Sequence, residues 1–310
     1  MSPSKKRALQ RPYKQVDVFT ATPYLGNPLA VVLNGEGLSD AEMAAFASWT
    51  NLSENTFLLE PTQPTADYRV RIFTPTGELA FAGHPTLGSC HAWLEAGGKP
   101  AASDIIQECK VGLVRIQHNA SRLAFAAPPF KRSAPSEAQL AQMAAALGIQ
   151  ASQIKASQLL DNGSIWCGLL LDSVDTVLAI NANFSAIKNN GIKIGVAGVY
   201  ISSAATQLIA KSSREARAFA PTTKIVIDEE AQPDIEVRAF TKTGQDPVTG
   251  GLNASLAQWL IADGFLPDKY LASQGTCLDR EGRVHIERDA SGQVWVGGDV
   301  ITCIDGSVSL

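Results

Sequence analysis

The chain has 310 residues, of which 45% are hydrophobic and 18% charged, and this composition and length predict a soluble protein of two domains. Its net charge of −4 argues against a nucleic-acid partner, which needs a clustered basic surface. The basic residues Lys5, Lys6, Arg7 and Arg11 are interpreted as a solvated tail, and no apolar segment typical of a secretory signal follows them. No apolar run approaches the roughly 20 residues of a membrane helix, so no membrane association is expected.

The first half of the chain combines short strands with two helices. A helix is predicted over residues 39–50, where Ser39 is the N-cap and Glu42 completes a capping box. A second helix is predicted from His84 or Pro85 to Glu95, ahead of two glycines. β-Branched and aromatic residues predict strands at 16–19, 29–33, 56–59 and 68–73.

The second half begins after a segment rich in proline and serine, at residues 127–135, which is the best linker candidate. Helices are predicted over residues 136–147 and from about Val248 to residue 262. Strands are predicted at 165–171, 198–202, 224–227 and 235–240, and a hairpin over 283–304 with its turn at Ser291-Gly292.

An internal repeat organises this pattern. Residues 70–77 match residues 237–244 at six of eight positions, and each segment runs through a glycine-containing turn into an apolar helix with a Trp-Leu pair. Such a helix must be buried on nearly all sides, so a sheet is expected to curl around it. The repeat predicts an α+β fold with two pseudo-symmetric domains, 13–130 and 131–310, and a cleft between them. The last strand is a candidate to complete the first domain.

The starts of the two repeated helices, at residues 82–86 and 247–251, both contain small residues and glycines. Free backbone N–H groups at a helix start carry partial positive charge and can approach an anion closely where no side chain intervenes. Two such starts, one in each domain, would hold a substrate carboxylate between them.

Three titratable residues lie near these helix starts in the sequence. Glu54 sits between a predicted helix and an apolar strand, where burial would raise its pKa toward a value useful for proton transfer; the alternative is an exposed loop glutamate. His84 could donate a hydrogen bond or exchange protons, or be structural. Asp246 precedes a proline and could equally cap a helix.

Cofactor and metal motifs are not apparent. The chain has five cysteines at scattered positions with no C-x-x-C pair, which argues against a disulfide framework and against a zinc site. Its four histidines show no ligand spacing, and no P-loop or dinucleotide fingerprint follows a predicted strand. Free thiols are typical of a reducing compartment, so a cytoplasmic location is predicted.

The chain resembles the PhzF family of phenazine-biosynthesis-like proteins over nearly its whole length, from about Tyr13 to Gly306. The segments that carry the resemblance are Val16-Asp17-Val18-Phe19, Gly26-Asn27-Pro28-Leu29-Ala30-Val31-Val32, Asn51-Leu52-Ser53-Glu54, Phe81-Ala82-Gly83-His84-Pro85-Thr86, Asp246-Pro247-Val248-Thr249-Gly250, Ser273-Gln274-Gly275 and Val296-Gly297-Gly298. The resemblance implies a diaminopimelate-epimerase-like fold, in which each domain curls a mostly antiparallel sheet around a central helix. It also implies a homodimer that needs no cofactor.

The resemblance further implies an isomerase that moves a proton within a small carboxylate substrate. Glu54 matches the family's proton-shuttling acid/base, and His84 and Asp246 match residues that flank the substrate. In the best-understood branch, the reaction moves a proton between ring carbons of a hydroxylated dihydroanthranilate.

The substrate carboxylate would be held by the backbone around Gly83 and Gly250, with Ser53 and Gly251 as further binding residues. Family members commonly have Glu-Asp-Pro-Val-Thr-Gly-Ser at the second helix start, whereas this chain has Gln245 and Gly251 at the first and last of these positions. The change at Gly251 removes a hydroxyl donor and leaves the backbone N–H.

Two other functions are compatible with the same fold. An amino-acid epimerase or racemase would use two cysteines as opposed acid and base, but the corresponding positions here are Glu54 and Asp246, and Cys90 falls inside the first repeated helix. A non-catalytic protein that binds a small carboxylate would also suit the departure at Gly251. Proton exchange at carbon that depends on Glu54 distinguishes the isomerase from the binding protein.

Overall fold

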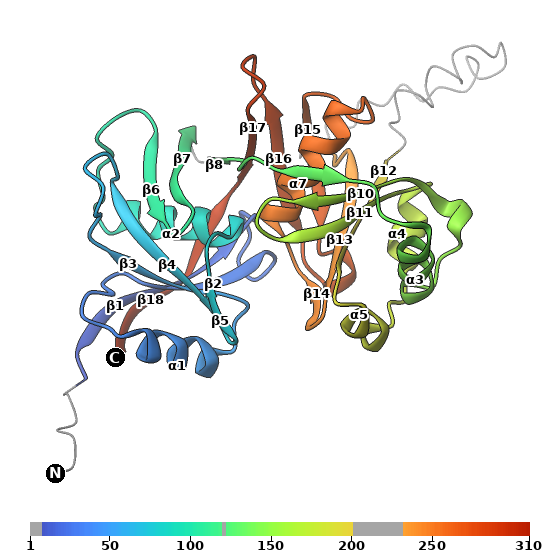
Figure 1. The fold of residues 1–310 in the computed structure, drawn as a ribbon. Coiled ribbons are helices and arrows are strands. Elements are labelled where there is room, and N and C mark those ends of the chain that lie inside the picture. The colour runs from blue at the N-terminus through green and yellow to red at the C-terminus, as the bar shows by residue number, and fades with distance from the viewer. Residues whose placement is uncertain (1–7, 120–121, 201–231) are drawn as a thin grey trace, which may run out of the picture.

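The structure is a computed structural model that describes residues 8–119, 122–200 and 232–310. Its helices are α1 (Asp40–Thr50), α2 (Gly83–Glu95), α3 (Glu137–Leu147), α4 (Val174–Ala179), α5 (Phe184–Asn190) and α7 (Gly250–Ala262). Its strands are β1 (Gln10–Val18), β2 (Asn27–Val32), β3 (Asn55–Leu59), β4 (Tyr68–Thr74), β5 (Gly77–Leu79), β6 (Ile105–Cys109), β7 (Gly112–Asn119), β8 (Arg122–Ala126), β9 (Lys131–Ser133), β10 (Ile154–Asp161), β11 (Ile165–Leu171), β12 (Lys193–Val199), β13 (Ile235–Thr241), β14 (Gly244–Asp246), β15 (Lys269–Gln274), β16 (Gly282–Arg288), β17 (Val294–Gly298) and β18 (Val300–Ser309). Figure 1 shows these elements gathered into two halves.

The strand pairing of the first half is repeated in the second. In the first half β2 pairs in parallel with β3, β3 antiparallel with β4, and β4 in parallel with β6. In the second half β11 pairs in parallel with β12, β12 antiparallel with β13, and β13 in parallel with β15. The remaining pairs are antiparallel, including β8 with β17, which joins the two halves into one continuous sheet. β18 returns to pair with β1, so the last strand lies in the sheet of the first half.

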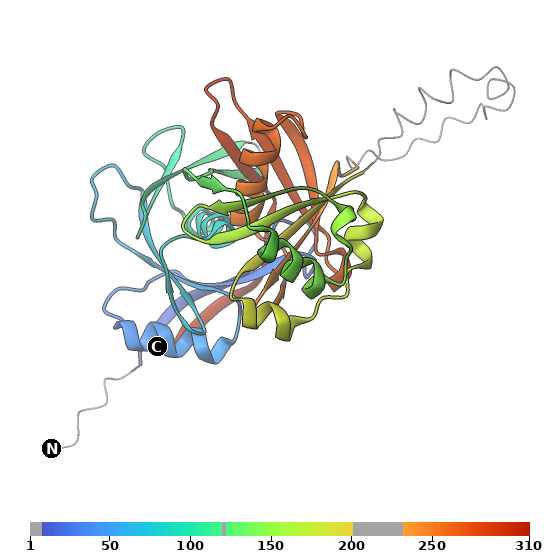
Figure 2. The same cartoon turned by 45° about the vertical axis from the view of Figure 1, so that its right-hand side comes forward.

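A buried helix fills the centre of each half. Helix α2 contacts β1, β2, β3 and β8, and α7 contacts β10, β16 and β17. Most residues of both helices are buried, including Leu87 of α2 and Trp259 of α7. Figure 2 shows strands of the first half enclosing α2. The predicted α+β fold, with two similar halves that each curl a mostly antiparallel sheet around a central helix, is confirmed.

The two central helices meet at their N-terminal ends because both begin with glycine. A Cβ atom added at Gly83 would lie 2.9 Å from the Cα of Gly250, and one added at Gly250 would lie 3.1 Å from the Cα of Gly83. A side chain at Gly83 would therefore force the backbone of Gly250 to shift, and one at Gly250 would make an unusually tight contact with Gly83. The glycines therefore bring both helix starts to one point at the junction of the halves.

Most of the predicted helices are confirmed, with small shifts at their starts. Helix α1 has the expected capping box between Ser39 and Glu42, and α3 has one between Ser136 and Gln139. Helix α2 begins at Gly83, and α7 begins two residues later than expected because Thr249 is its N-cap.

Several predictions from the sequence were wrong or lie outside the described residues. Arg11 does not belong to a solvated tail: it is part of β1, is 6% exposed, and donates a 2.6 Å hydrogen bond to the carbonyl of Asn34. The strand predicted at 198–202 begins earlier, as β12, which ends at Val199, and residues 201 and 202 lie outside the described residues. The strand predicted at 224–227 lies outside the described residues. The C-terminal hairpin is confirmed as β16 and β17, but β18 follows it as a third strand.

The Trp-Leu pairs of the two repeats do not occupy the same helical position. When α2 and α7 are aligned at Gly83 and Gly250, Trp93 lies one position further along its helix than Trp259. Trp93 stacks on Tyr68 with a centroid distance of 5.2 Å, whereas Trp259 is 1% exposed. The structure therefore supports the repeat at the strands and the helix starts. The Trp-Leu pairs are not equivalent and do not support it.

Candidate active site

Glu54 lies where α1 gives way to β3. The helix ends at Asn51, whose left-handed φ of 56° turns the chain, and Glu54 comes directly before the first residue of β3. Its side chain is 17% exposed. Burial raises the pKa of Glu54, while a hydrogen bond from Ser53 and the positive charge of Lys193 oppose this shift. Glu54 is therefore not an exposed loop residue.

His84, the second residue of α2, lies beside Glu54. Its side chain is buried, with Nε2 3.6 Å from Glu54 Oε2 and Nδ1 3.4 Å from Asn27 Nδ2. Burial lowers the pKa of His84 to about 4, only partly offset by the charge of Asp246, so the imidazole is neutral at pH 7 and forms no ion pair with Glu54.

The contact with Asn27 favours one tautomer of His84. Asn27 Nδ2 can only donate, and it also donates to Asp246 and Val248, so its 3.4 Å contact favours the tautomer in which Nδ1 of His84 is unprotonated and Nε2 carries the proton. Nε2 is buried and has no hydrogen-bond partner among the described residues. A buried N–H without a partner costs about 1–3 kcal/mol, and a bound ligand would remove that cost.

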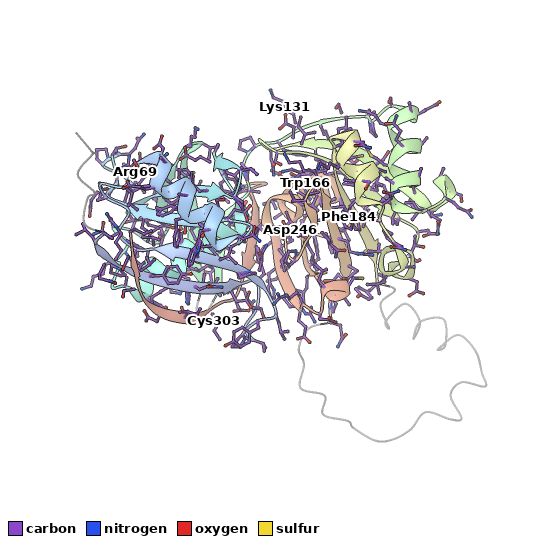
Figure 3. All side chains as sticks on the ribbon, turned by 90° about the horizontal axis from the view of Figure 1, so that it is seen from below. Arg69, Lys131, Trp166, Phe184, Asp246 and Cys303 are labelled. Atoms are coloured by element: carbon purple, nitrogen blue, oxygen red, sulfur yellow. The ribbon has the colours of Figure 1, made fainter. Side chains whose placement is uncertain are left out.

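Asp246, the last residue of β14, supplies the acidic group of the second half. Its Oδ1 accepts a 2.9 Å hydrogen bond from Asn27 Nδ2, which comes from the first half. Burial and then the negative charge of Glu54 raise the pKa of Asp246 to about 6. The N-cap of α7 is Thr249, so Asp246 does not cap that helix. Figure 3 shows Asp246 on the side of the second half that faces the first.

Two buried amide side chains support this cluster, and no role was predicted for either. Asn27 also donates to the carbonyl of Val248 at 2.8 Å, which ties β2 to the segment before α7. Gln274 accepts hydrogen bonds from the Thr249 N–H and Asn253 Nδ2, and donates to the Thr249 hydroxyl and the Asp246 carbonyl. Both lie in motifs that carry the family resemblance, which was the available signal.

The predicted carboxylate-binding residues lie around the same point. Neither α2 nor α7 has a side-chain cap, so their first N–H groups receive no side-chain acceptor. The hydroxyl of Ser53 is exposed and lies 3.5 Å from Asn27 Oδ1, at the limit of a hydrogen bond. Gly251 borders open space, because a Cβ atom added there would have no neighbour closer than Asn162 Nδ2, at 4.0 Å.

Other features of the surface do not compete with this cluster. One hollow of about 300 Å³ is lined by residues such as Ile149 and Ala179, and another of about 280 Å³ by Asn34 and Trp93. Neither includes Glu54, His84 or Asp246. Within the described ranges, no three histidine, cysteine, aspartate or glutamate side chains are grouped to hold a metal ion. No helix in the described part of the chain is long and apolar enough to cross a membrane.

The fold is that of PhzF- and epimerase-like proteins. The structure is similar to a phenazine biosynthesis protein of the PhzF family from Bacillus anthracis, with a TM-score of 0.76, 19% identity, and coverage of 97% of this chain and 100% of that one. It is less similar to a hydroxyproline epimerase from Agrobacterium vitis, with a TM-score of 0.55, 14% identity, and coverage of 99% and 94%.

The chain belongs to the phenazine biosynthesis-like protein family (PhzC-PhzF), whose model matches residues 16–306. It is 35% identical over 95% of its length to the Antisense-enhancing sequence 1 protein of Schizosaccharomyces pombe, 97% of which is covered. It is also 32% identical, over 57% of its length and 63% of the relative's, to a trans-2,3-dihydro-3-hydroxyanthranilate isomerase of Pseudomonas fluorescens. The prediction that the chain is an isomerase is confirmed at the level of this class.

Proposed function

We propose that the chain is a cofactor-independent isomerase that moves a proton between two carbons of a small carboxylate substrate, with Glu54 as the acid/base. The observation that carries this proposal is the position of Glu54. It is mostly buried, its pKa is raised by that burial, and it lies beside an unpartnered N–H of neutral His84. A carboxyl group with a raised pKa can accept a proton from carbon and return it near neutral pH.

The geometry supports a single-base mechanism. Glu54 removes a proton from one carbon, and the electron pair of the broken C–H bond spreads over the substrate toward its carboxylate. The carboxyl group of Glu54 then returns the proton to a second carbon of the substrate. No proton is gained or lost overall, and no cofactor takes part. The Nε2–H of His84 and the uncapped N–H groups of α2 and α7 stabilise the charge that develops between these steps.

Asp246 would assist by holding a proton that it shares with the substrate in a hydrogen bond. Because the pKa of Asp246 is raised to about 6, a fraction of this side chain is protonated near neutral pH and can donate a hydrogen bond to the substrate. Asn27 fixes the orientation of its carboxyl group. The relative from Pseudomonas fluorescens is named for a dihydro-hydroxyanthranilate, which is a ring carboxylate, and ring carboxylates are the substrate class that we propose.

The test is proton exchange at carbon in deuterated water. Trans-2,3-dihydro-3-hydroxyanthranilate and 4-hydroxyproline serve as probes, and deuterium incorporation is followed by NMR. We expect Glu54→Gln to reduce exchange by roughly 10²- to 10⁴-fold, the usual contribution of a general acid/base, while the fold is kept. The matched control is Glu60→Gln, which changes an exposed glutamate directly after β3. This variant should incorporate deuterium at the same rate as the parent protein. Exchange that survives in Glu54→Gln would remove Glu54 from the mechanism.

The alternatives give different outcomes in this experiment. Binding of carboxylates without exchange would favour a non-catalytic binding protein. A two-thiol epimerase is not favoured, because burial raises the pKa of both Cys90 and Cys167 to about 12 and neither lies beside Glu54 or Asp246. The homodimer, the absence of a cofactor and the cytoplasmic location stay predictions.

A further inference from the structure

The strand register shows which residues of the two halves are equivalent. Phe73 and Phe240 are matching residues of the internal repeat, on β4 and β13. Phe73 pairs with Asn55 on β3, and Phe240 pairs with Ile194 on β12. Asn55 and Ile194 therefore occupy the same place in the two halves. The next pairs along these strands, Ile72 with Thr56 and Ala239 with Gly195, keep the same register.

Lys193 is consequently the counterpart of Glu54. Glu54 directly precedes Asn55, and Lys193 directly precedes Ile194. The second half thus carries a basic residue at the position that is equivalent to the proposed acid/base, and the charges of the two residues act on each other. No local sequence motif marks Lys193, and it takes no part in the mechanism above.

The surroundings of Lys193 hold its ammonium group near the junction of the halves. Its Nζ donates a 2.7 Å hydrogen bond to the Ser164 hydroxyl and lies 5.3 Å from the ring centroid of Trp166. The loop that carries Ser164 is tied to the start of α7, because Asn162 Nδ2 donates to the carbonyl of Gly251 at 2.9 Å. Figure 3 shows Trp166, like Asp246, on the side of the second half that faces the first.

The charge of Lys193 is not neutralised by a contact. The structure records no carboxylate within 4.0 Å of its ammonium group among the residues it describes, although the side chain is partly buried. The charges that act on Lys193 are those of Glu54 and Asp246, which attract it, and that of Lys242, which repels it. Burial lowers the pKa of Lys193. A partly buried cation without an anionic partner is costly, and an anion bound beside it would offset that cost.

We propose that Lys193 binds a second acidic group of the substrate, so that the site selects small molecules with two acidic groups. One carboxylate lies between the helix starts, as in the proposed function on which this inference rests for its geometry. The second lies beside the ammonium group of Lys193. This arrangement keeps the reacting carbons beside Glu54 and places opposite charges together at the far end of the substrate.

The test compares monoacids with diacids of matched size. Binding of butyrate and succinate, pentanoate and glutarate, and benzoate and isophthalate is measured by calorimetry. We expect the parent protein to bind at least one diacid roughly 10- to 100-fold more tightly than its monoacid partner, the effect of one hydrogen bond to a charged group. Lys193→Met should abolish this advantage and leave the monoacid affinity unchanged. Lys242→Met, an exposed lysine in the same neighbourhood, is the matched control and should keep the advantage.

Two results would overturn the inference. One is a parent protein with no diacid preference in any of the three pairs, a result that needs no variant. The other is a Lys193→Met variant that weakens monoacids and diacids equally. Lys193→Gln and Lys193→Arg extend the test if the methionine variant does not fold, because only the arginine variant should retain a preference. All binding is repeated in the Glu54→Gln background, where no proton transfer is expected, so failure of this inference and failure of the proposed function are read separately.

Discussion

The starts of α2 and α7 are equivalent places that carry different residues. Both helices begin with a glycine that touches the other, Gly83 against Gly250. The next position is His84 in α2, which is buried and faces Glu54, and Gly251 in α7, which borders open space. The comparison teaches that the shared backbone supplies the binding frame, while single side chains that differ between the halves supply the chemistry.

The same division holds at the strand ends. The position before β3 is Glu54 and the position before β12 is Lys193, as their register requires. Leu79 of β5 pairs with Ile72, and Asp246 of β14 pairs with the equivalent Ala239. Leu79 packs against the hydrophobic core, whereas Asp246 turns the corresponding place into an acidic one. Each half therefore contributes one buried acid from a different element.

One methyl group added at Gly83 should disturb the contact between the two helix starts. In Gly83→Ala the new Cβ would lie 2.9 Å from backbone atoms of Gly250, which cannot move without shifting α7. We expect a loss of about 1–3 kcal/mol in the free energy of unfolding, measured by urea denaturation, and weaker binding of every carboxylate tested. Gly251→Ala is the matched control in the adjacent position of α7 and should change stability by less than about 0.5 kcal/mol. Equal stability of the two variants would show that the close contact between Gly83 and Gly250 does not contribute to the stability of the fold.

The acidic difference between the halves is tested by pH. The pKa of Asp246 is about 6 in the folded protein and about 3.9 in an unfolded chain. Because the folded value is the higher one, the stability that the protonated carboxyl contributes is present below about pH 4 and is lost as the pH rises through 6. We expect the parent to lose stability relative to Asp246→Asn over this range, by about 1–3 kcal/mol.

Urea denaturation at pH 4, 5, 6 and 7 measures this difference. Because the charge of Glu54 is the second cause of the raised pKa, Glu54→Gln should move the stability change of Asp246 to lower pH. A parent and an Asp246→Asn variant whose stabilities run parallel from pH 4 to 7 would contradict the assignment of Asp246 as a buried acid coupled to Glu54.

The paired helix starts and the strands before them could be predicted from the sequence, because their motifs are short and occur in both halves. Glycines at both helix starts and the matching segments 70–77 and 237–244 are visible without any structure. Strand β6 was missed because it buries polar residues, which hides its pattern. Gln107 is 0% exposed and bonds to Tyr68 and Thr86, and Glu108 accepts a hydrogen bond from the Thr62 N–H at 2.7 Å.

The asymmetric residues of the candidate site could be predicted only in part. Glu54, His84 and Asp246 lie in motifs of the family resemblance. Lys193 could not be found, because its equivalence to Glu54 depends on how β12 pairs with β13, and β12 itself was placed too late in the sequence. Asn27 also lies in a motif of the family resemblance, but its role could not be predicted, since its three contacts come from segments far from it in the chain.

The smallest expected effect comes from filling the open position in α7. In Gly251→Ser the new side chain meets no atom closer than Asn162 Nδ2, at 4.0 Å from its Cβ, so stability should change by less than about 0.5 kcal/mol. The hydroxyl would stand at the first turn of α7, where a donor can reach a carboxylate held by the helix starts. One added hydrogen bond is worth about 0.5–1.5 kcal/mol, so monoacid affinity should rise by roughly 2- to 10-fold. Gly251→Ala adds the Cβ without the hydroxyl, and calorimetry on benzoate separates the two. If the serine and alanine variants bind benzoate equally, the start of α7 does not hold the carboxylate, and the two helix starts differ in function as well as in side chains.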